Sequence, residues 1–257
     1  MRLWLPGRRH YTGHSPTRSL LTGAAVMPAI PIVAYADFAE QHLARDSAFA
    51  YQCNRCSHCC RNFRIPVGPF DLLQLAATLG VSTTVVIRDH LANGFHLRRE
   101  AGGACVFLGK TGCTVHPGRP MVCRVYPLGR NVNHGEEWFS VLHPVPDSAA
   151  VWGKAGTVAD YLEQQGANPS IDGLRLYTEL YMRLSKQLEE AVDDHGNVPD
   201  TGWADATGLG LVAGGLLDPD PTIISHCQRE GLPVPKDVMD KARCHIAAER
   251  RRMADLR

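Results

Sequence analysis

One short segment limits the fold of this chain more than any other. Residues 53–60, with the sequence CNRCSHCC, place four thiols within eight positions. In a C-x2-C spacing the two intervening residues let the backbone turn so that both sulfurs converge on one centre. The spacing occurs twice in succession, so Cys53, Cys56 and Cys59 can face a common point. Cys60 should project elsewhere, where it can bind a second metal or reach the first from another side.

Three further cysteines form a second block, so seven of the nine cysteines lie close together in sequence: Cys53, Cys56, Cys59, Cys60, Cys105, Cys113 and Cys123. The alternative to a soft-metal site is a set of disulfides. An odd number of clustered cysteines and an adjacent pair fit one disulfide framework poorly, and such frameworks are typical of secreted chains far shorter than 257 residues. We therefore predict metal or iron–sulfur binding, and leave disulfides and inert or redox thiols as alternatives.

Charge supports the same prediction. The stretches 51–70 and 101–135 contain no Asp or Glu, yet they hold seven cations: Arg55, Arg61, Arg64, Lys110, Arg119, Arg124 and Arg130. Nearby cations lower thiol pKa values and offset the negative charge of a metal held by thiolates. The alternative is a solvated basic face or a patch that binds phosphate or nucleic acid. The net charge of only +1 and the lack of interleaved aromatic residues argue against nucleic acid.

The first 36 residues form either a basic tail or a segment that resembles a signal peptide. They contain four arginines and no acid, and a mildly apolar stretch over 20–36 ends in Ala-Tyr-Ala. Pro28 and Pro31 interrupt that stretch, and Met27 is an alternative start. Because exported free thiols would be exposed to oxidation, we expect a cytoplasmic protein, with export as the alternative. No apolar run reaches the roughly 18 residues of a membrane-spanning helix, so we expect no membrane partner.

Local patterns predict a mainly α fold with short β segments. We expect a helix over 37–49, an extended segment over 63–67, and a helix from Pro69 to Leu79 that Gly80 ends. A further helix should follow Ser82 and run toward 93–94. The second cysteine block, 103–116, reads as a tight hairpin in which Gly109 and Gly112 supply the turn. Prolines then frame a short helical turn that carries Cys123.

The rest of the chain reads as helical. Thr157 should cap a helix that ends at Gly166, and apolar residues from Leu174 to Leu188 recur at three- and four-residue intervals along an amphipathic helix of about five turns. Residues 196–221 read as loop, with a short helix near Leu211, and a last helix from about 235 ends in the basic run 250–252. Cys227 and Cys244 lie outside any metal spacing and read as ordinary thiols. We thus predict three parts: the tail 1–36, an irregular cysteine-rich metal-binding domain over 37–166, and a helical extension over 167–257.

Several ordered motifs give the chain a resemblance to a known family. The run CNRCSHCC, a C-x2-L followed by a Gly-Cys pair, and RPMVCRVYPL resemble the YkgJ-type cysteine-cluster family, which is described as zinc- or iron-chelating, over about residues 50–165. The resemblance implies that the seven clustered cysteines form the metal-binding set and that Arg119, Arg124 and Asp71 belong to the signature. Where that family often has a Cys-Pro pair, this chain has His143-Pro144, so His143 is a candidate ligand or a surface residue. His58 and His116 are similarly placed candidates.

The chain lacks the dinucleotide-binding, phosphate-binding, serine-hydrolase and zinc-protease motifs. Its C-x2-C-x2-C run also differs from the spacing of radical S-adenosylmethionine enzymes. We therefore expect a protein that holds an iron–sulfur cluster, the preferred cofactor, or zinc, for structure, electron transfer or metal handling. Seven thiols exceed the four that a structural zinc needs, which modestly favours iron. Two alternatives remain: methyl transfer, because flagellin lysine N-methylases resemble the same superfamily, and thiol–disulfide exchange.

Overall fold

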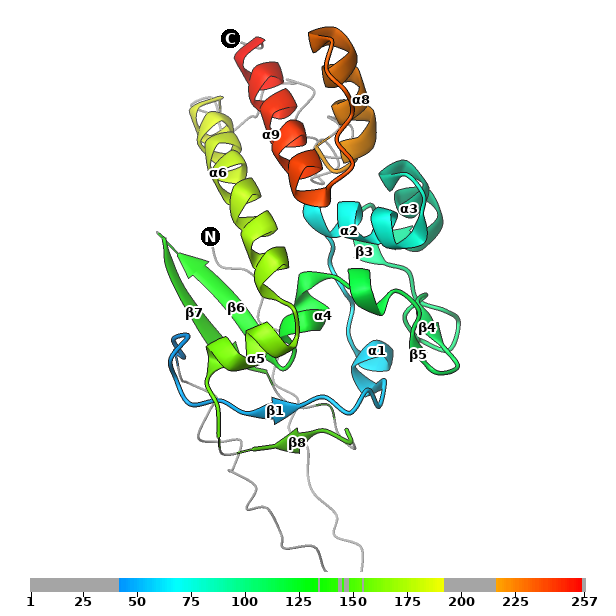
Figure 1. The fold of residues 1–257 in the computed structure, drawn as a ribbon, viewed down its shortest axis with the longest axis vertical. Helices are drawn as coiled ribbons and strands as arrows, with labels where there is room; N and C mark the ends of the chain where they lie inside the picture. The colour runs from blue at the N-terminus through cyan, green and yellow to red at the C-terminus, as the bar shows by residue number, and fades with distance from the viewer. Residues whose placement is uncertain are drawn as a thin grey trace, which may run out of the picture. The chain divides into compact units, whose positions relative to one another are not determined.

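The computed structural model describes residues 42–133, 135–142, 145, 148–153, 155–191 and 216–255, with the backbone alone for 184–191 and 255. Figure 1 shows its elements in chain order: β1 (Tyr51–Gln52), α1 (His58–Asn62), α2 (Pro69–Leu79), α3 (Thr83–His90), β2 (Leu91–Ala92), β3 (His96–Leu97), β4 (Leu108–Gly109), β5 (Gly112–Cys113), the 3-10 helix η2 (His116–Gly118), α4 (Met121–Val125), β6 (Leu128–Asn133), β7 (Glu136–Val141), β8 (Val151–Trp152), α5 (Val158–Gln164), α6 (Asn168–Ala191), α8 (Pro219–Glu230) and α9 (Val238–Asp255). The strands form short antiparallel pairs. The predicted fold class, mainly α with short β segments, is confirmed.

Helix α2 begins and ends as the sequence predicts. Pro69 occupies its first turn, where a missing backbone N–H costs nothing, and Gly80 ends it with a left-handed φ of 68°. Ser82 then caps α3 by accepting a hydrogen bond from the Val85 amide. Helix α3 ends at His90, earlier than expected, because the chain pairs β2 with β3 through a turn at 93–94.

The segment before the first cysteine is not the helix that we predicted for 37–49. Residues 37–41 lie outside the described residues, and 42–49 form a turn between two isolated bridges, Leu43 with Phe139 and Ala48 with Thr157. The apolar spacing of Leu43 and Phe49 still marks buried positions, since both pack into one core cluster. Pairing of Leu43 with β7 thus overrides the local helical pattern.

The cysteine blocks come next in the chain. Residues 63–67 are extended, as predicted, and pair with 95–97 through the Pro66–His96 bridge. The second block forms the predicted hairpin, in which β4 pairs with β5. Gly112 has a φ of 116°, which favours glycine, whereas Gly109 has an ordinary φ and is not the turn-forming residue that we expected. Helix α4 follows Pro120 and carries Cys123, as predicted.

Helix α5 has the predicted cap: Thr157 and Asp160 form a reciprocal capping box, and the chain leaves the helix at Gly166 with a φ of 60°. Its Tyr161 and Leu162 pack under the β6–β7 pair in a cluster with Phe139 and Ile171. This cluster fixes α5 and the start of α6 beside the strand pairs.

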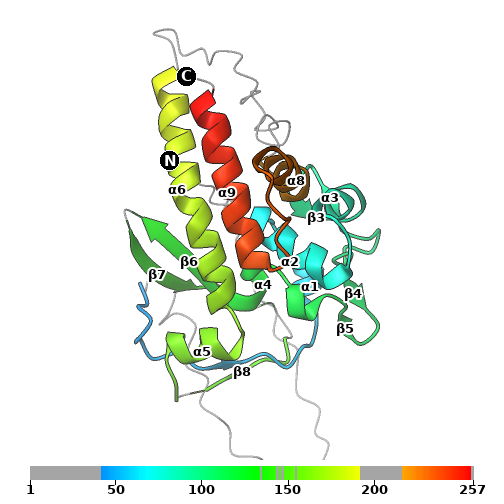
Figure 2. The same cartoon turned by 45° about the horizontal axis from the view of Figure 1, so that its top comes forward.

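The C-terminal helices build a separate cluster on α2. Phe70 and Leu73 of α2 pack with Tyr177 of α6 and Ile246 of α9, and Figures 1 and 2 show α6 and α9 side by side. The predicted amphipathic helix and last helix are thus confirmed. The predicted short helix near Leu211 lies outside the described residues, and the proposed domain boundary at 166/167 stays a prediction.

Helix α8 corrects one prediction, since residues 219–221 were read as loop. Pro219 and Pro221 lie in its first turn, where proline is tolerated. Thr83, at the start of α3, and Asp220 also form two reciprocal hydrogen bonds. The Thr83 amide donates to the Asp220 carboxylate at 2.8 Å, and the Asp220 amide donates to the Thr83 hydroxyl at 3.0 Å. No single described helix is long and apolar enough to cross a membrane. Helices α2 and α3 reach the required length and composition only when taken together, and they are bent by 95° relative to each other.

Candidate metal centre

All seven clustered cysteines line one cavity of about 270 Å³: Cys53, Cys56, Cys59, Cys60, Cys105, Cys113 and Cys123. Most of the remaining wall is apolar and includes Phe63, Ile65, Leu97, Phe107, Val115 and Val122. The cavity therefore collects thiols from segments up to 70 positions apart in sequence, because 123 minus 53 is 70. Cys227 and Cys244 do not line it.

Helix α1 and one backbone hydrogen bond join the two cysteine blocks. Ser57 precedes α1 in a left-handed conformation, with a φ of 65°, and the helix then carries Cys59 and Cys60. The Cys105 amide donates to the Cys60 carbonyl at 2.8 Å, which fixes the second block beside the first. Arg99 holds the end of α1, since its guanidinium donates to the Arg61 and Phe63 carbonyls at 2.5 and 2.7 Å.

The buried Asp71 carboxylate positions the last cysteine. Its two oxygens accept hydrogen bonds from the Gly68 amide at 3.1 Å and the Met121 amide at 2.9 Å. The first bond caps α2 and the second holds the first residue of α4, so one side chain sets the distance between α2 and Cys123. Burial raises the pKa of Asp71 above its ordinary value, although both amides and the Arg124 guanidinium oppose the shift.

Two buried arginines fasten the wall of the cavity to α5. Arg119 donates to the His116 carbonyl at 2.8 Å and to the Gln165 carbonyl at 3.0 Å. Arg124 donates to the carbonyls of Pro117, Arg119 and Gly166. Arg119 lines the cavity, whereas Arg124 satisfies carbonyls behind it. Burial lowers the pKa of both guanidiniums, and thiols at 113 and 123 oppose the shift of Arg119.

By their electrostatic neighbours the thiols divide into two sets, which we name inner and outer; among the seven, only Cys53 is exposed. The inner set is Cys60, Cys105, Cys113 and Cys123. Burial raises the pKa of Cys105, Cys113 and Cys123, and the neighbouring Cys60 thiol raises each of these pKa values further. The outer set is Cys53, Cys56 and Cys59. These thiols lie near the phenols of Tyr51 and Tyr126, where burial raises the pKa of both tyrosines and the three thiols raise it further.

The two sets meet at Cys59 and Cys60, whose sulfurs are 4.0 Å apart. Their hydrogen bond lowers the pKa of Cys59 and raises that of Cys60, so Cys59 is the better thiolate of the pair. Burial tends to raise the pKa of Cys56, but hydrogen bonds from His58 outweigh it and lower the pKa. The inner thiols thus hold their protons until a cation replaces them, which is the usual coupling of metal binding to proton release.

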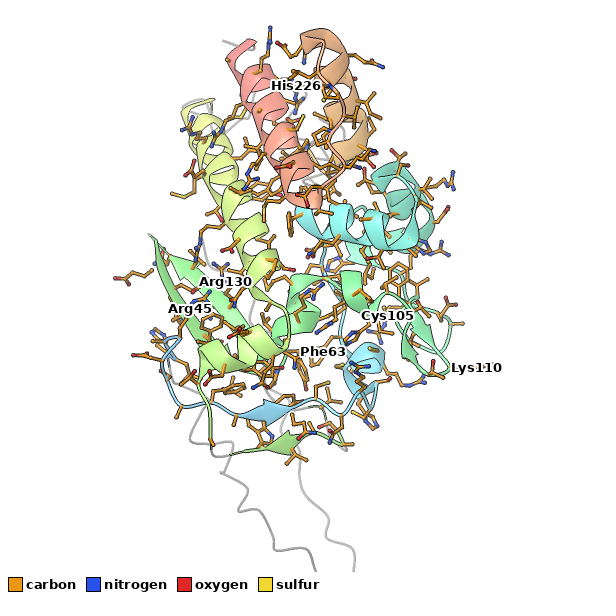
Figure 3. The ribbon with its side chains drawn as sticks, in the orientation of Figure 1. Arg45, Phe63, Cys105, Lys110, Arg130 and His226 are labelled. Atoms are coloured by element: carbon orange, nitrogen blue, oxygen red, sulfur yellow. The ribbon has the colours of Figure 1, made fainter. Side chains whose placement is uncertain are left out.

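The basic residues of the sequence do not all reach the thiols. Arg55, Arg64 and Arg119 line the cavity. Arg130 does not, because its Nε donates to Glu137 at 2.6 Å in the β6–β7 pair, and Figure 3 shows Arg130 beside Arg45, away from Cys105. Counting Arg130 with the cations that stabilise thiolates is therefore wrong: charge bias along a sequence does not say which face of a strand a residue occupies.

The candidate histidines have different positions. His116 lines the cavity, and burial together with Arg119 lowers its pKa, which favours a neutral ring. His58 begins α1 and hydrogen bonds to Cys56 but is not part of the cavity wall. His143 lies outside the described residues. Sequence reasoning missed Arg99, which lies outside both acid-free stretches, and the aromatic wall of Tyr51 and Tyr126.

All nine cysteines, each within a described part of the chain, are free thiols. Across the described ranges, no three His, Cys, Asp or Glu side chains stand in an arrangement that holds a single ion. The sulfurs thus surround a space rather than one coordination point. Thiolates are the ligands that zinc and iron–sulfur clusters prefer, so the donor chemistry fits either group.

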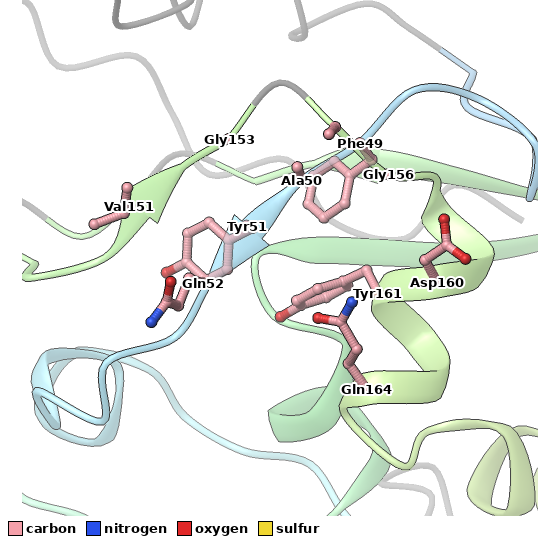
Figure 4. Close-up of a pocket in the computed structure, with 11 residues that line it drawn as sticks. Phe49, Ala50, Tyr51, Gln52, Val151, Gly153, Gly156, Asp160, Tyr161 and Gln164 are labelled. Atoms are coloured by element: carbon pink, nitrogen blue, oxygen red, sulfur yellow. The ribbon is translucent and has the colours of Figure 1, made fainter. Parts of the chain in front are cut away.

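A second cavity, of about 200 Å³, lies between β1 and α5. Figure 4 shows Tyr51 and Gln52 from β1 and Tyr161 and Gln164 from α5 around it. Tyr51 belongs to the walls of both cavities. No cysteine lines the second one, so it does not extend the thiol site.

Fold and cavity together define a mainly helical, cysteine-rich protein in which seven thiols line one cavity. Residues 52–141 match the model of the family CxxCxxCC, described as "Putative zinc- or iron-chelating domain". The match spans α1 to β7 and all seven clustered cysteines. No curated protein and no solved structure matches the chain.

Proposed function

We propose that the seven thiols of the cavity hold an iron–sulfur cluster, with zinc as the second possibility, in a protein that serves structure, electron transfer or metal handling. One observation carries this proposal: two cysteine blocks far apart in sequence contribute every one of their sulfurs to the same cavity. Neither block supplies such a site alone. A zinc- or iron-chelating domain over residues 52–141 supports the coarser statement that the site binds metal.

The size and wall of the cavity favour a cluster over one zinc ion. A tetrahedral zinc is enclosed by four ligands at about 2.0–2.3 Å and leaves no space between them. Here seven thiols surround about 270 Å³. An apolar wall also suits a cluster, because solvent exposure and hydrogen bonds to sulfur set its potential and its stability.

The inner set supplies the proposed ligands. Cys60, Cys105, Cys113 and Cys123 are four thiols, the number that a cubane or a two-iron cluster takes. Asp71 holds the Met121 amide at the start of the helix that carries Cys123, and the Cys60 carbonyl holds the Cys105 amide, so these ligands rest on fixed elements. Arg119 interacts with the Cys113 and Cys123 thiols and would offset the negative charge of a thiolate-bound cluster. Bound there, the cluster would supply one-electron transfer or would stabilise the fold by cross-linking the two cysteine blocks. Around the cavity, the described residues give no specific support to methyl transfer or to thiol–disulfide exchange.

The same reasoning proposes a cytoplasmic protein, since its thiols must stay reduced to bind metal. Anaerobic purification followed by iron, sulfide and zinc analysis tests the proposal. We expect iron and sulfide in similar amounts and broad visible absorbance that dithionite bleaches. A colourless protein with one or two zinc ions would replace the cluster by zinc, and a protein free of both metals would overturn metal binding altogether.

A further inference from the structure

The two cysteines outside the cavity lie against each other. Cys227 is in the last turn of α8 and Cys244 is in the second turn of α9, and their sulfurs are 3.6 Å apart. Cys227 is only 1% exposed, among Ile223, Ala242 and Ile246, whereas Cys244 is half-buried. Sequence alone gave no sign of this pairing, since the two residues are 17 positions apart and follow no metal spacing.

We propose that Cys227 and Cys244 form a second thiol site, a modification site at which oxidation creates a disulfide between α8 and α9. Their sulfurs are at van der Waals contact, and a disulfide needs a separation of about 2.05 Å. The sulfurs must therefore approach by roughly 1.5 Å for the bond to form. The proposal does not depend on metal in the seven-thiol cavity, because neither residue lines it.

The oxidant that fits this site is a small soluble disulfide, and its exchange balances in two steps. The Cys244 thiolate, formed by loss of a proton to solvent, attacks one sulfur of the small disulfide, breaks its S–S bond and releases one thiolate. Cys227 then loses its proton and attacks the Cys244 sulfur, which breaks the mixed disulfide and releases the second thiolate. The protein loses two electrons and two protons, and the small disulfide becomes two thiols.

The burial of the two residues sets the order of these steps. Cys244 is the more exposed of the two thiols, so it reacts first, and the enclosed Cys227 then attacks the mixed disulfide at the Cys244 sulfur, 3.6 Å away. Burial and contact with Cys227 raise the pKa of Cys244, so the first step should be slow at neutral pH. The product joins two helices that already meet through apolar packing and through the ion pairs Lys241–Asp220 and Arg251–Glu230.

The experiment uses the full-length, metal-loaded protein equilibrated in glutathione buffers of rising oxidation, then alkylated and digested with trypsin without reduction. Cleavage after Lys186, Arg229, Arg243 and Arg250 should release peptides 187–229 and 244–250. We expect them as one cross-linked species, two hydrogens lighter than their sum. Recovery of both peptides alkylated or glutathionylated at every buffer would overturn the proposal, as would a cross-link from either one to a cavity cysteine.

Thermal unfolding supplies the second readout. Closing this loop should raise the melting temperature of the oxidised protein by roughly 5–10 °C over the reduced one. Cys244→Ser, at a half-exposed position, should fold and lose both the cross-link and the rise in melting temperature. Cys227→Ala provides a second variant with the same expectation. An oxidation-dependent rise that persists in both variants would assign the effect to other cysteines.

Discussion

The seven-thiol cavity and the Cys227–Cys244 pair contain the same side chain in two different surroundings. Around the cavity, thiols come from short helices, a hairpin strand and the loops between them, and cations such as Arg55 and Arg119 also line it. The pair lies between two regular helices in an apolar cluster. A cavity lined by several thiols and by cations suits a soft metal, whereas two thiols in contact with each other suit two-electron oxidation to a disulfide. The number of sulfurs and the nearby charge, rather than cysteine itself, separate the two chemistries.

The largest expected effect comes from Cys123→Ser. Cys123 is the most enclosed of the cavity thiols and belongs to the inner set, so its removal should abolish most of the bound metal. Metal analysis of anaerobically purified variant and wild type measures this directly. Cys227→Ser is the matched control, because it removes a buried thiol from the other region and should keep the full metal content. Equal metal loss in both variants would erase the distinction between the two regions.

Asp71→Asn should have the next largest effect. The carboxylate accepts amide hydrogens with both oxygens, whereas an asparagine side chain has one oxygen and turns an N–H toward one of those donors. A buried amide left unpaired costs about 1–3 kcal/mol of unfolding free energy. Urea unfolding measures this loss. Because α4 is released, metal retention under a chelator should fall as well, although Asp71 is no ligand; unchanged retention would show that α4 is held by other contacts.

Glu137→Gln tests the correction made for Arg130. Glu137 accepts hydrogen bonds from Arg45 at 2.7 Å and from Arg130 at 2.6 Å, and these outweigh burial to lower its pKa. A lowered pKa in the folded state contributes stability above the unfolded value of 4.5, and that stability is lost as pH falls through the folded value. The substitution should therefore cost about 1–2 kcal/mol near pH 7.

Unfolding curves of Glu137→Gln and wild type at several pH values give the check. The difference in unfolding free energy should shrink as pH falls below 4.5, while metal content near pH 7 stays at the wild-type level. Reduced metal content at neutral pH would return Arg130 to the group of cations that influence the thiols.

Local chemistry explains which features the sequence could predict. Ser82, Gly80 and Thr157 act within one turn of their own position, so the helix ends that they set were predicted correctly. The family match bears out the chelating character that the cysteine spacing indicated. Spacing could not show that Cys60 bonds through its carbonyl to the second block, because that contact joins residues 45 positions apart, from 60 to 105.

The sequence-based predictions were wrong where residues far away in sequence determine the local structure. The pattern over 42–49 has helical spacing, yet strand β7 pairs with it at Leu43. Helix α8 was missed because prolines at 219 and 221 suggest loop, while its start is fixed by Thr83, far away in sequence. The contact of Cys227 with Cys244 likewise depends on how α8 packs on α9. In each case tertiary contacts outweigh local preference.

The smallest expected effect belongs to Arg243→Ala, next to the oxidisable pair. Arg243 forms an exposed ion pair with Asp240 one turn earlier, with side chains 62% and 59% exposed. Exposed pairs of this kind contribute about 0.3–0.5 kcal/mol, and alanine recovers some of that through its helix propensity. Urea unfolding should therefore show a change below about 0.5 kcal/mol, and the Cys227–Cys244 cross-link should form as in wild type. A larger loss, or a failure to cross-link, would mean that charge at the surface of α9 sets the position of Cys244, and the pair could no longer be described by apolar packing alone.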